Sequence, residues 1–253
     1  MGKIYTIANQ KGGAGKTTTA HNLAAGLKES GARVLLVDMD SQYNLTTVTG
    51  ADSDAKGTSE LLAGTVKPAA VIQELESGLF IIPGSAALAN QSIEVSGLQK
   101  ALDPLREAFD YIVIDAPPAL GQLSAACLVA CDEVIIPTSP SVLGAEGVRQ
   151  LYNGLIEVIQ SPVDGSMALN KGLKVAGILI NNHSGRTNIS KLGAELLEKI
   201  AAEEMETKVF ESRIRRAAAI QEAEAFRDNI FDYAPKAKIT DDYRKFIKEL
   251  IRG

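Results

Sequence analysis

The sequence contains little cysteine, no segment typical of secretion and no apolar run long enough to span a bilayer. Its two cysteines, Cys127 and Cys131, stand four residues apart in an alanine-rich apolar segment, so a helix would carry both on one face. A zinc or iron–sulfur site requires further ligands, which the neighbouring sequence does not supply. We therefore expect both thiols to pack in the core of a reduced, cytosolic protein that does not use the membrane.

An excess of positive charge is also missing. Lysine and arginine number 26 against 31 acidic residues, and the net charge of −5 excludes a uniformly basic coat for nucleic acid but not a local basic patch. The hydrophobic fraction of 45% is ordinary for a soluble globular protein. Because no proline-rich linker, low-complexity tract or internal repeat divides the sequence, we expect residues 1–253 to form a single domain.

Short apolar runs alternate along the chain with segments of helical periodicity. Continuous apolar runs of this kind are typical of strands that are buried on both faces of a parallel sheet. The alternation predicts an α/β fold, a single doubly wound domain with a mainly parallel sheet and helices on both faces. The expected strands are 4–8, 33–38, 79–84, 111–115, 133–137, 173–181 and a short one at 208–214, and the expected helices are 19–28, 98–109, 123–130, 145–159, 189–200 and 243–251.

A glycine-rich segment at residues 10–18 points to function. It follows an apolar strand and precedes a helix, and its three glycines let the backbone approach an anion so that several N–H groups point at phosphate oxygens. The helix N-terminus adds a partial positive charge, Lys16 adds a full one, and Thr17 can give its hydroxyl to Mg²⁺. The pattern predicts the phosphate-binding loop (P-loop) of a P-loop NTPase. The expected nucleotide contacts are Lys11, Gly12, Gly13, Ala14, Gly15, Lys16, Thr17 and Thr18.

Three aspartates follow two of the predicted strands, and hydrolysis, unlike binding, requires such groups. Asp115 ends one strand, and the two prolines after it leave little helix for it to cap, so we predict that it holds Mg²⁺ directly or through water. Asp38 and Asp40 follow another strand. Alternation along an extended chain places both on one side, near the metal and the γ-phosphate, and a solvated acidic turn is the alternative.

The P-loop departs from the general pattern, which has glycine where this chain has Gln10. The form Lys-Gly-Gly-x-Gly-Lys-Thr, with Lys11 as its additional lysine, resembles the deviant P-loop of the ParA/MinD family of ATPases. Residues 35–42 resemble the Asp-x-Asp-x-Gln segment of that family, and residues 115–118 resemble its Walker B segment. The resemblance spans nearly the whole chain and is closest to chromosomal, Soj-like ParA partition ATPases, without the N-terminal helix-turn-helix extension of larger plasmid ParA proteins.

The resemblance implies ATP and Mg²⁺ as cofactors and gives roles to the charged residues. Lys11 and Lys16 are implied as catalytic, Lys11 by reaching the partner's nucleotide across a two-fold interface, although it could also be a solvated loop lysine. Asp40 is the aspartate tied to water activation in this family, whereas the preceding aspartate supports the metal and the loop. The residues implied for the metal are Thr17, Asp38 and Asp115.

The resemblance also implies contacts to the base of the nucleotide. Asn181 corresponds to the asparagine that reads the adenine edge in MinD-like members, and Arg215 and Arg216 fall near the loop that closes over adenine. Arg215 stands where the family has a proline, and Ala219 stands where it often has an arginine, so the adenine loop and the basic surface depart from the family pattern.

Basic residues near the end of the chain predict weak, salt-sensitive and sequence-independent binding to DNA. Dimerisation would double this patch and raise its avidity. The expected DNA-binding residues are Arg186, Arg213, Arg215 and Arg216. The competing interpretation is that these arginines only balance the neighbouring acids Glu203, Glu204, Glu206 and Glu211.

The leading hypothesis is a nucleoid-associated partition ATPase for plasmids or chromosomes, which binds DNA as an ATP-dependent homodimer. A ParB-like partner would stimulate its slow hydrolysis. The nearest alternative is a MinD-like membrane-cycling ATPase or one that positions another cargo, and a third is a non-catalytic, nucleotide-gated scaffold. The MinD-like alternative needs a free amphipathic helix after the last helix, and we expect the apolar side of residues 243–251 to belong to the domain's own core.

Overall fold

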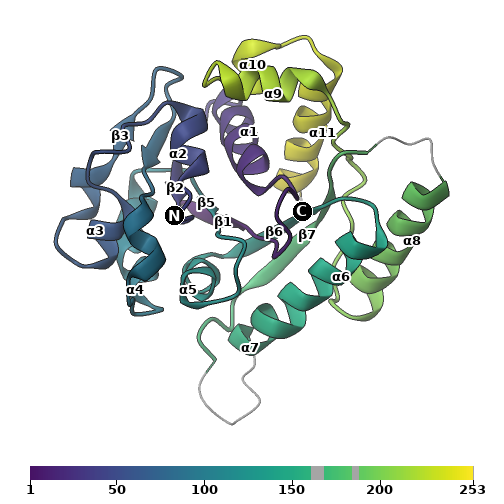
Figure 1. Ribbon diagram of the computed structural model, residues 1–253, viewed down its shortest axis with the longest axis horizontal. Coiled ribbons are helices and arrows are strands. Elements are labelled where there is room, and N and C mark those ends of the chain that lie inside the picture. The colour runs from purple at the N-terminus through teal and green to yellow at the C-terminus, as the bar shows by residue number, and fades with distance from the viewer. Residues whose placement is uncertain (161–167, 184–187, 253) are drawn as a thin grey trace.

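The computed structural model describes residues 1–160, 168–183 and 188–252, and within them the strands form one twisted sheet (Figure 1). The strand order is β3-β4-β2-β5-β1-β6-β7, and every neighbouring pair is parallel except β3 and β4. The strands are β1 (Lys3–Ile7), β2 (Val34–Asp38), β3 (Gln73–Glu74), β4 (Phe80–Ile82), β5 (Tyr111–Asp115), β6 (Glu133–Thr138) and β7 (Lys174–Ile180).

Helices cover both faces of the sheet (Figure 1). One face carries α1 (Lys16–Glu29), α9 (Ala218–Ala225), α10 (Ile230–Tyr233) and α11 (Lys238–Arg252). The other face carries α4 (Gly97–Leu102), α5 (Gln122–Ala130), α6 (Val142–Leu151), α7 (Glu157–Gln160) and α8 (Asn188–Glu203). The short helices α2 (Asn44–Thr49) and α3 (Thr58–Leu62) lie between β2 and β3, and a π-helical turn (Tyr152–Ile156) joins α6 to α7.

The core has two parts, one on each face, and alternate residues of a central strand enter each part. In β2, Leu35 and Val37 pack on the α4–α8 side, whereas Val34 and Leu36 pack on the α1 side. All four are at most 2% exposed, which explains why the strand reads as a continuous apolar run and not as an alternating one. The predicted doubly wound α/β architecture is confirmed.

Several boundaries differ from the prediction. The helix expected at 98–109 ends at Leu102, and Asp103–Glu107 continues as a 3₁₀ turn with Pro104 in its first turn, where the missing N–H costs least. Residues 208–214 form no regular strand, although they run beside β7 with the isolated bridge Ile178–Val209 and backbone hydrogen bonds such as that from the Ile214 N–H to the Ile180 carbonyl. The prediction missed α2, α9, α10 and the two-residue β3, which are too short to show a period.

Cys127 and Cys131 are free and buried, as predicted, and burial raises the pKa of both thiols, that of Cys131 to about 12. Cys127 lies in α5 and its carbonyl accepts the Thr6 hydroxyl of β1 at 2.9 Å. In the part of the chain that the structure describes, no helix is both long and apolar enough to cross a membrane.

Candidate nucleotide-binding and catalytic site

The predicted site residues meet where four strands end. β1 is followed by the P-loop and β7 by Asn181, whereas Asp38 is the last residue of β2, with Asp40 just after it, and Asp115 is the last residue of β5. We call this group of residues the carboxyl edge. β1 lies between β5 and β6, so the P-loop leaves the middle of the sheet, where ligands bind in open α/β folds.

The P-loop conformation depends on glycine. Gly13 and Gly15 have φ angles of 72° and 87°, in the left-handed region that favours this residue. A Cβ on Gly15 would also lie 2.6 Å from the amide nitrogen of Asn181. Thr18, a predicted nucleotide contact, donates its hydroxyl to Glu224 of α9 at 2.7 Å, so in this arrangement it links the loop to that helix.

Asn9, which the prediction overlooked, fixes the start of the loop. Its amide nitrogen donates to the Pro137 carbonyl of β6 at 2.7 Å, and its oxygen accepts the Lys11 backbone N–H at 2.9 Å. The Lys11 side chain is only partly buried and makes no hydrogen bond or ion pair with the described residues. The backbone of Lys11 is therefore held while its ammonium stays available.

Lys16 is the first residue of α1 and is only 8% exposed. Burial lowers the pKa of its ammonium, and the charges of Asp115 and Asp40 oppose this effect. No carboxylate of the described residues reaches ion-pair distance of Lys16. A buried, unpaired ammonium beside backbone N–H groups is suited to a phosphate.

Asp115 and Thr17 form the pair that could hold a metal. The Thr17 hydroxyl donates to Oδ2 of Asp115 at 2.7 Å, whereas Oδ1 is buried with no hydrogen-bond partner among the described residues. Burial, helped by the nearby charge of Asp38, raises the pKa of Asp115 to about 8. An orphaned carboxylate oxygen next to a hydroxyl fits Mg²⁺, a metal that is bound through one or two carboxylates and takes its other ligands from water and phosphate.

Asp38 anchors the loop that carries Asp40. Its Oδ2 accepts both the backbone N–H and the hydroxyl of Thr46, at 2.8 and 2.7 Å, and its Oδ1 accepts the Asp40 N–H at 3.1 Å. Burial raises the pKa of Asp38 to about 6 despite these bonds. Both carboxylate oxygens are thus engaged with the protein, and the metal role of Asp38 stays a prediction.

Thr46 supports Asp38 through hydrogen bonds that the sequence did not signal. Its hydroxyl also accepts the Gly84 N–H at 2.8 Å, so it links the end of β4 to Asp38. Asp40 is 8% exposed, and its Oδ1 accepts the Gln42 N–H at 3.0 Å. The structure brings Asp40 close enough to Lys16 and Asp115 to influence both, and the role of Asp40 in water activation stays a prediction.

A cavity of about 390 Å³ continues from the P-loop towards α11 and is lined by Asn181, Arg215 and Arg216 among others. The amide nitrogen of Asn181 donates to the Ala14 carbonyl and the Thr19 hydroxyl, both at 3.1 Å. Its oxygen is buried and has no partner in the described residues, which leaves an acceptor for an amino group such as that of adenine.

The predicted DNA-binding arginines differ in their partners. Arg215 makes two hydrogen bonds of 2.5 and 2.7 Å to Asp242, and Arg213 is paired with Glu198 at 3.4 Å. Arg216 is exposed and has no partner in the described part of the chain. Arg186 lies outside the described residues.

The acids of the competing interpretation have other partners or none. Glu203 pairs with Lys199 at 3.8 Å and Glu204 with Arg149 at 2.5 Å, so neither balances the arginines of residues 213–216. Arg213 and Arg215 are nevertheless neutralised, by Glu198 and Asp242 respectively. The sequence analysis did not consider these two acids.

The apolar side of α11 faces the core. Tyr243, Phe246, Ile247 and Leu250 are at most 5% exposed and pack against the α1 side of the sheet. Ile251 is 49% exposed. As expected, this apolar side belongs to the domain's own core, so it is not available for insertion into a membrane.

Comparison with known proteins agrees with this geometry. A family model described as an AAA domain matches residues 2–174. Sporulation initiation inhibitor protein Soj of Bacillus subtilis is 35% identical over 99% of this chain and 98% of its own length, and chromosome-partitioning ATPase Soj of Thermus thermophilus is 36% identical over 97% and 94%. The chain belongs to the ParA/MinD family of P-loop ATPases.

Comparison with a solved structure gives the same result. Cobyrinic acid a,c-diamide synthase from Mycobacterium smegmatis, with bound ADP and magnesium, superposes with a TM-score of 0.81 and 32% identity, covering 100% of this chain and 95% of that one. The predicted family and the predicted P-loop NTPase fold are confirmed, and as a ParA/MinD protein the chain is an ATPase.

Proposed function

We propose that this protein is a partition ATPase, which segregates a plasmid or chromosome by cycling between an ATP-bound dimer on DNA and a free monomer. It takes ATP and Mg²⁺, binds DNA without sequence preference as the dimer and lies with the nucleoid. A ParB-like DNA-bound partner stimulates its slow hydrolysis and so releases it. The relative from Thermus thermophilus that carries the name chromosome-partitioning ATPase supports this choice among ParA/MinD activities.

The observation that carries the proposal is the set of unsatisfied groups at the carboxyl edge. Lys16 is buried without a counter-ion, and Oδ1 of Asp115 is buried without a partner in the described chain. Burying such groups unpaired is costly unless a charged ligand completes them. A Mg-nucleotide does so, with Lys16 and the P-loop N–H groups on the phosphates, and with Thr17 and Asp115 as the residues that would hold the metal.

Hydrolysis requires an oriented water, and Asp40 is the residue best placed for it. Its carboxylate is nearly buried and lies close to Lys16 and Asp115. A carboxylate there can orient water and accept its proton, while bound Mg²⁺ neutralises charge that develops on the phosphates. Asp38 and Thr46 hold the Asp40 loop in place.

The surface beside the P-loop supports a dimer. The Lys11 ammonium has no partner in the described chain, and a Cβ on Gly147 of α6 would lie 3.7 Å from the Lys11 Cβ. Val142 and Leu143, at the start of the same helix, are 61% and 72% exposed. Exposed apolar side chains next to an unpaired lysine favour an interface that forms only when an anion is present to receive the lysine.

The experiment measures mass by light scattering after gel filtration, with ADP and with a non-hydrolysable ATP analogue. We expect the wild type to dimerise only with the analogue, and Lys11→Ala to bind the analogue but stay monomeric. Lys56→Ala, at an exposed lysine elsewhere on the chain, is the control and should dimerise. Dimerisation of Lys11→Ala equal to that of wild type would show that Lys11 does not act across an interface.

A second experiment separates partition from the other ParA/MinD activities. Gel retardation of random DNA should require ATP and fail with ADP or without nucleotide, and a gene for a DNA-binding protein next to this one would support the same conclusion. Sedimentation with liposomes and ATP, without DNA retardation, would favour a MinD-like cycle instead.

A further inference from the structure

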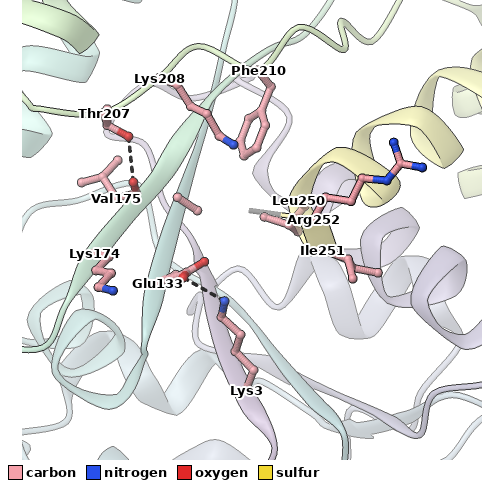
Figure 2. Close-up of a pocket in the computed structure, with 11 residues that line it drawn as sticks. Lys3, Glu133, Lys174, Val175, Thr207, Lys208, Phe210, Leu250, Ile251 and Arg252 are labelled. Carbon is pink, nitrogen blue, oxygen red and sulfur yellow. Dashed lines mark hydrogen bonds and ion pairs between the residues drawn. The ribbon is translucent and has the colours of Figure 1, made fainter.

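A second cavity lies at the opposite end of the sheet, where β1, β6 and β7 begin (Figure 2). Its volume is about 440 Å³, which is within the range of small-molecule sites. We call it the amino-edge cavity; its lining residues include Lys3, Glu133, Lys174, Lys208 and Arg252. No residue of the nucleotide cavity contributes to it.

Positive charge dominates this cavity although the chain is acidic overall. Glu133 is its single carboxylate among the described residues, and Lys3 neutralises it at 2.8 Å. Lys174 and Arg252 are exposed and make no ion pair with the described residues. The Lys208 ammonium lies 5.4 Å from the centre of the Phe210 ring and also makes no ion pair with them. Three cationic side chains therefore remain without a counter-ion in the described chain.

The remaining lining residues are apolar except for Thr207, and Phe210 among them is firmly packed. Figure 2 shows the Lys208 ammonium beside the Phe210 ring, with the Lys3–Glu133 pair across the hollow and the Arg252 guanidinium extending outward. Phe210 is 1% exposed and packs edge-on against Phe246 of α11, with ring centres 5.0 Å apart. The apolar lining residues are Val175, Ala176, Phe210, Leu250 and Ile251.

We propose that the amino-edge cavity binds a small anionic ligand with an apolar part, such as a phosphorylated or carboxylated metabolite, and that it communicates with the nucleotide cavity. Unpaired ammonium groups beside a hollow provide the charge recognition, and the apolar lining favours a ligand body over a bare ion. Most of the apolar face of α11 is already buried in the core, so Ile251 is the exposed part of that face at this site.

The coupling between the amino-edge cavity and the nucleotide cavity rests on the elements that the two cavities share, and on nucleotide binding as proposed above. Four elements reach both cavities: β1 with the P-loop, β7 with Asn181, residues 207–216, and α11. β7 spans the distance with seven residues, or about 20 Å. A ligand that favours one arrangement of these elements must change nucleotide affinity by the same factor by which the nucleotide changes the ligand's affinity.

The test titrates phenyl phosphate into the intact chain saturated with ADP and Mg²⁺, which occupies the P-loop. Amide NMR shifts of residues 174–176 and 207–210 should move and saturate, and inorganic phosphate should bind there more weakly. The double variant Lys174→Met, Lys208→Met keeps the packing and removes two charges, so affinity should fall at least tenfold. Lys56→Met, Lys67→Met, at exposed lysines elsewhere, is the matched control and should bind as wild type.

Absence of saturable shifts at these residues, or equal affinity in the cavity variant, would overturn the proposal. So would binding of duplex DNA or of phosphatidylglycerol vesicles that depends on Lys174 and Lys208 without saturable binding of phenyl phosphate.

The link to the nucleotide is tested by repeating the titration with a non-hydrolysable ATP analogue in place of ADP. We expect affinities that differ about fivefold between the two states. Equal affinities would overturn the communication, and the P-loop amide shifts, which report nucleotide binding in the same spectra, distinguish this result from a failure of the nucleotide site itself.

Discussion

Charged side chains are arranged in opposite ways in two neighbouring regions. At the carboxyl edge, Lys16 and Asp115 are buried, yet Lys16 has no counter-ion and one oxygen of Asp115 has no partner in the described chain. In residues 213–216, Arg213 and Arg215 are more exposed, yet both are ion-paired. Unpaired burial costs on the order of several kcal/mol, whereas surface ion pairs are worth little either way. The carboxyl edge is thus built for a charged ligand, and in the other region Arg216 alone is free for one among these three arginines.

The largest expected effect is at the carboxyl edge. Asp40→Ala should lower ATP turnover by about 100-fold or more, the range of a lost general base, while nucleotide binding and dimerisation remain. Phosphate release and a fluorescent-nucleotide titration measure the two quantities. Asp54→Ala, in an exposed turn, is the control and should turn over normally. Unchanged turnover in Asp40→Ala would remove its catalytic role.

His21 of α1 is another ionisable side chain that is buried, so its protonation tests the cost of burying a charge in this protein. Burial lowers the pKa of His21 to about 4. Its pKa in the unfolded chain is about 6.5, so between these values only the unfolded state takes up the proton and stability falls as the pH falls. The loss should be about 1.4 kcal/mol per pH unit and about 3 kcal/mol in all. Urea unfolding between pH 7 and pH 4 measures it.

His21→Gln is the comparison that isolates this effect, because the variant should lack that part of the pH dependence. Asp38 and Asp115 act in the opposite direction in both proteins: their pKa values are raised to about 6 and about 8, so the stability they give at low pH is lost as the pH rises through those values. Identical pH slopes in wild type and variant would mean that His21 is not kept neutral by burial.

A smaller effect is expected from the residue that holds the Asp40 loop. Thr46→Val removes a hydroxyl that donates to Asp38 and accepts the Gly84 N–H, so unfolding free energy should fall by about 2 kcal/mol. The exposed neighbour Thr47, whose hydroxyl bonds only within its own helix turn, is the control, and Thr47→Val should change stability by less than about 0.5 kcal/mol. Equal losses in urea unfolding would contradict the anchoring role.

The smallest effect concerns the arginines. Arg216→Ala should weaken retardation of random DNA severalfold and reduce the salt dependence of binding by about one counter-ion, whereas Arg213→Ala, whose guanidinium is already paired with Glu198, should do less. Equal weakening by the two variants would show that ion pairing in the free protein does not determine which arginine binds DNA. The contrast drawn between paired and unpaired charges would then not hold for residues 213–216.

The sequence was sufficient for the features that depend on neighbouring residues. Gly13 and Gly15 indicate a left-handed backbone conformation, which glycine adopts more readily than other residues. The apolar run that ends in Asp115 predicts a buried strand that places a carboxylate at one edge of the sheet. Short elements such as α2 and α10 could not be predicted, because four to six residues carry no period and are held in place by packing.

Tertiary structure alone decided which of these groups are satisfied. Asp38 is bonded by Thr46, Arg215 by Asp242, and Asn181 by the carbonyl of Ala14, 167 residues away in the sequence. The physical reason is that a side chain's partners are set by how strands and helices pack, and no local pattern records them. The sequence thus named the charged residues of this ATPase, and the fold determined which of them are left unpaired for a ligand.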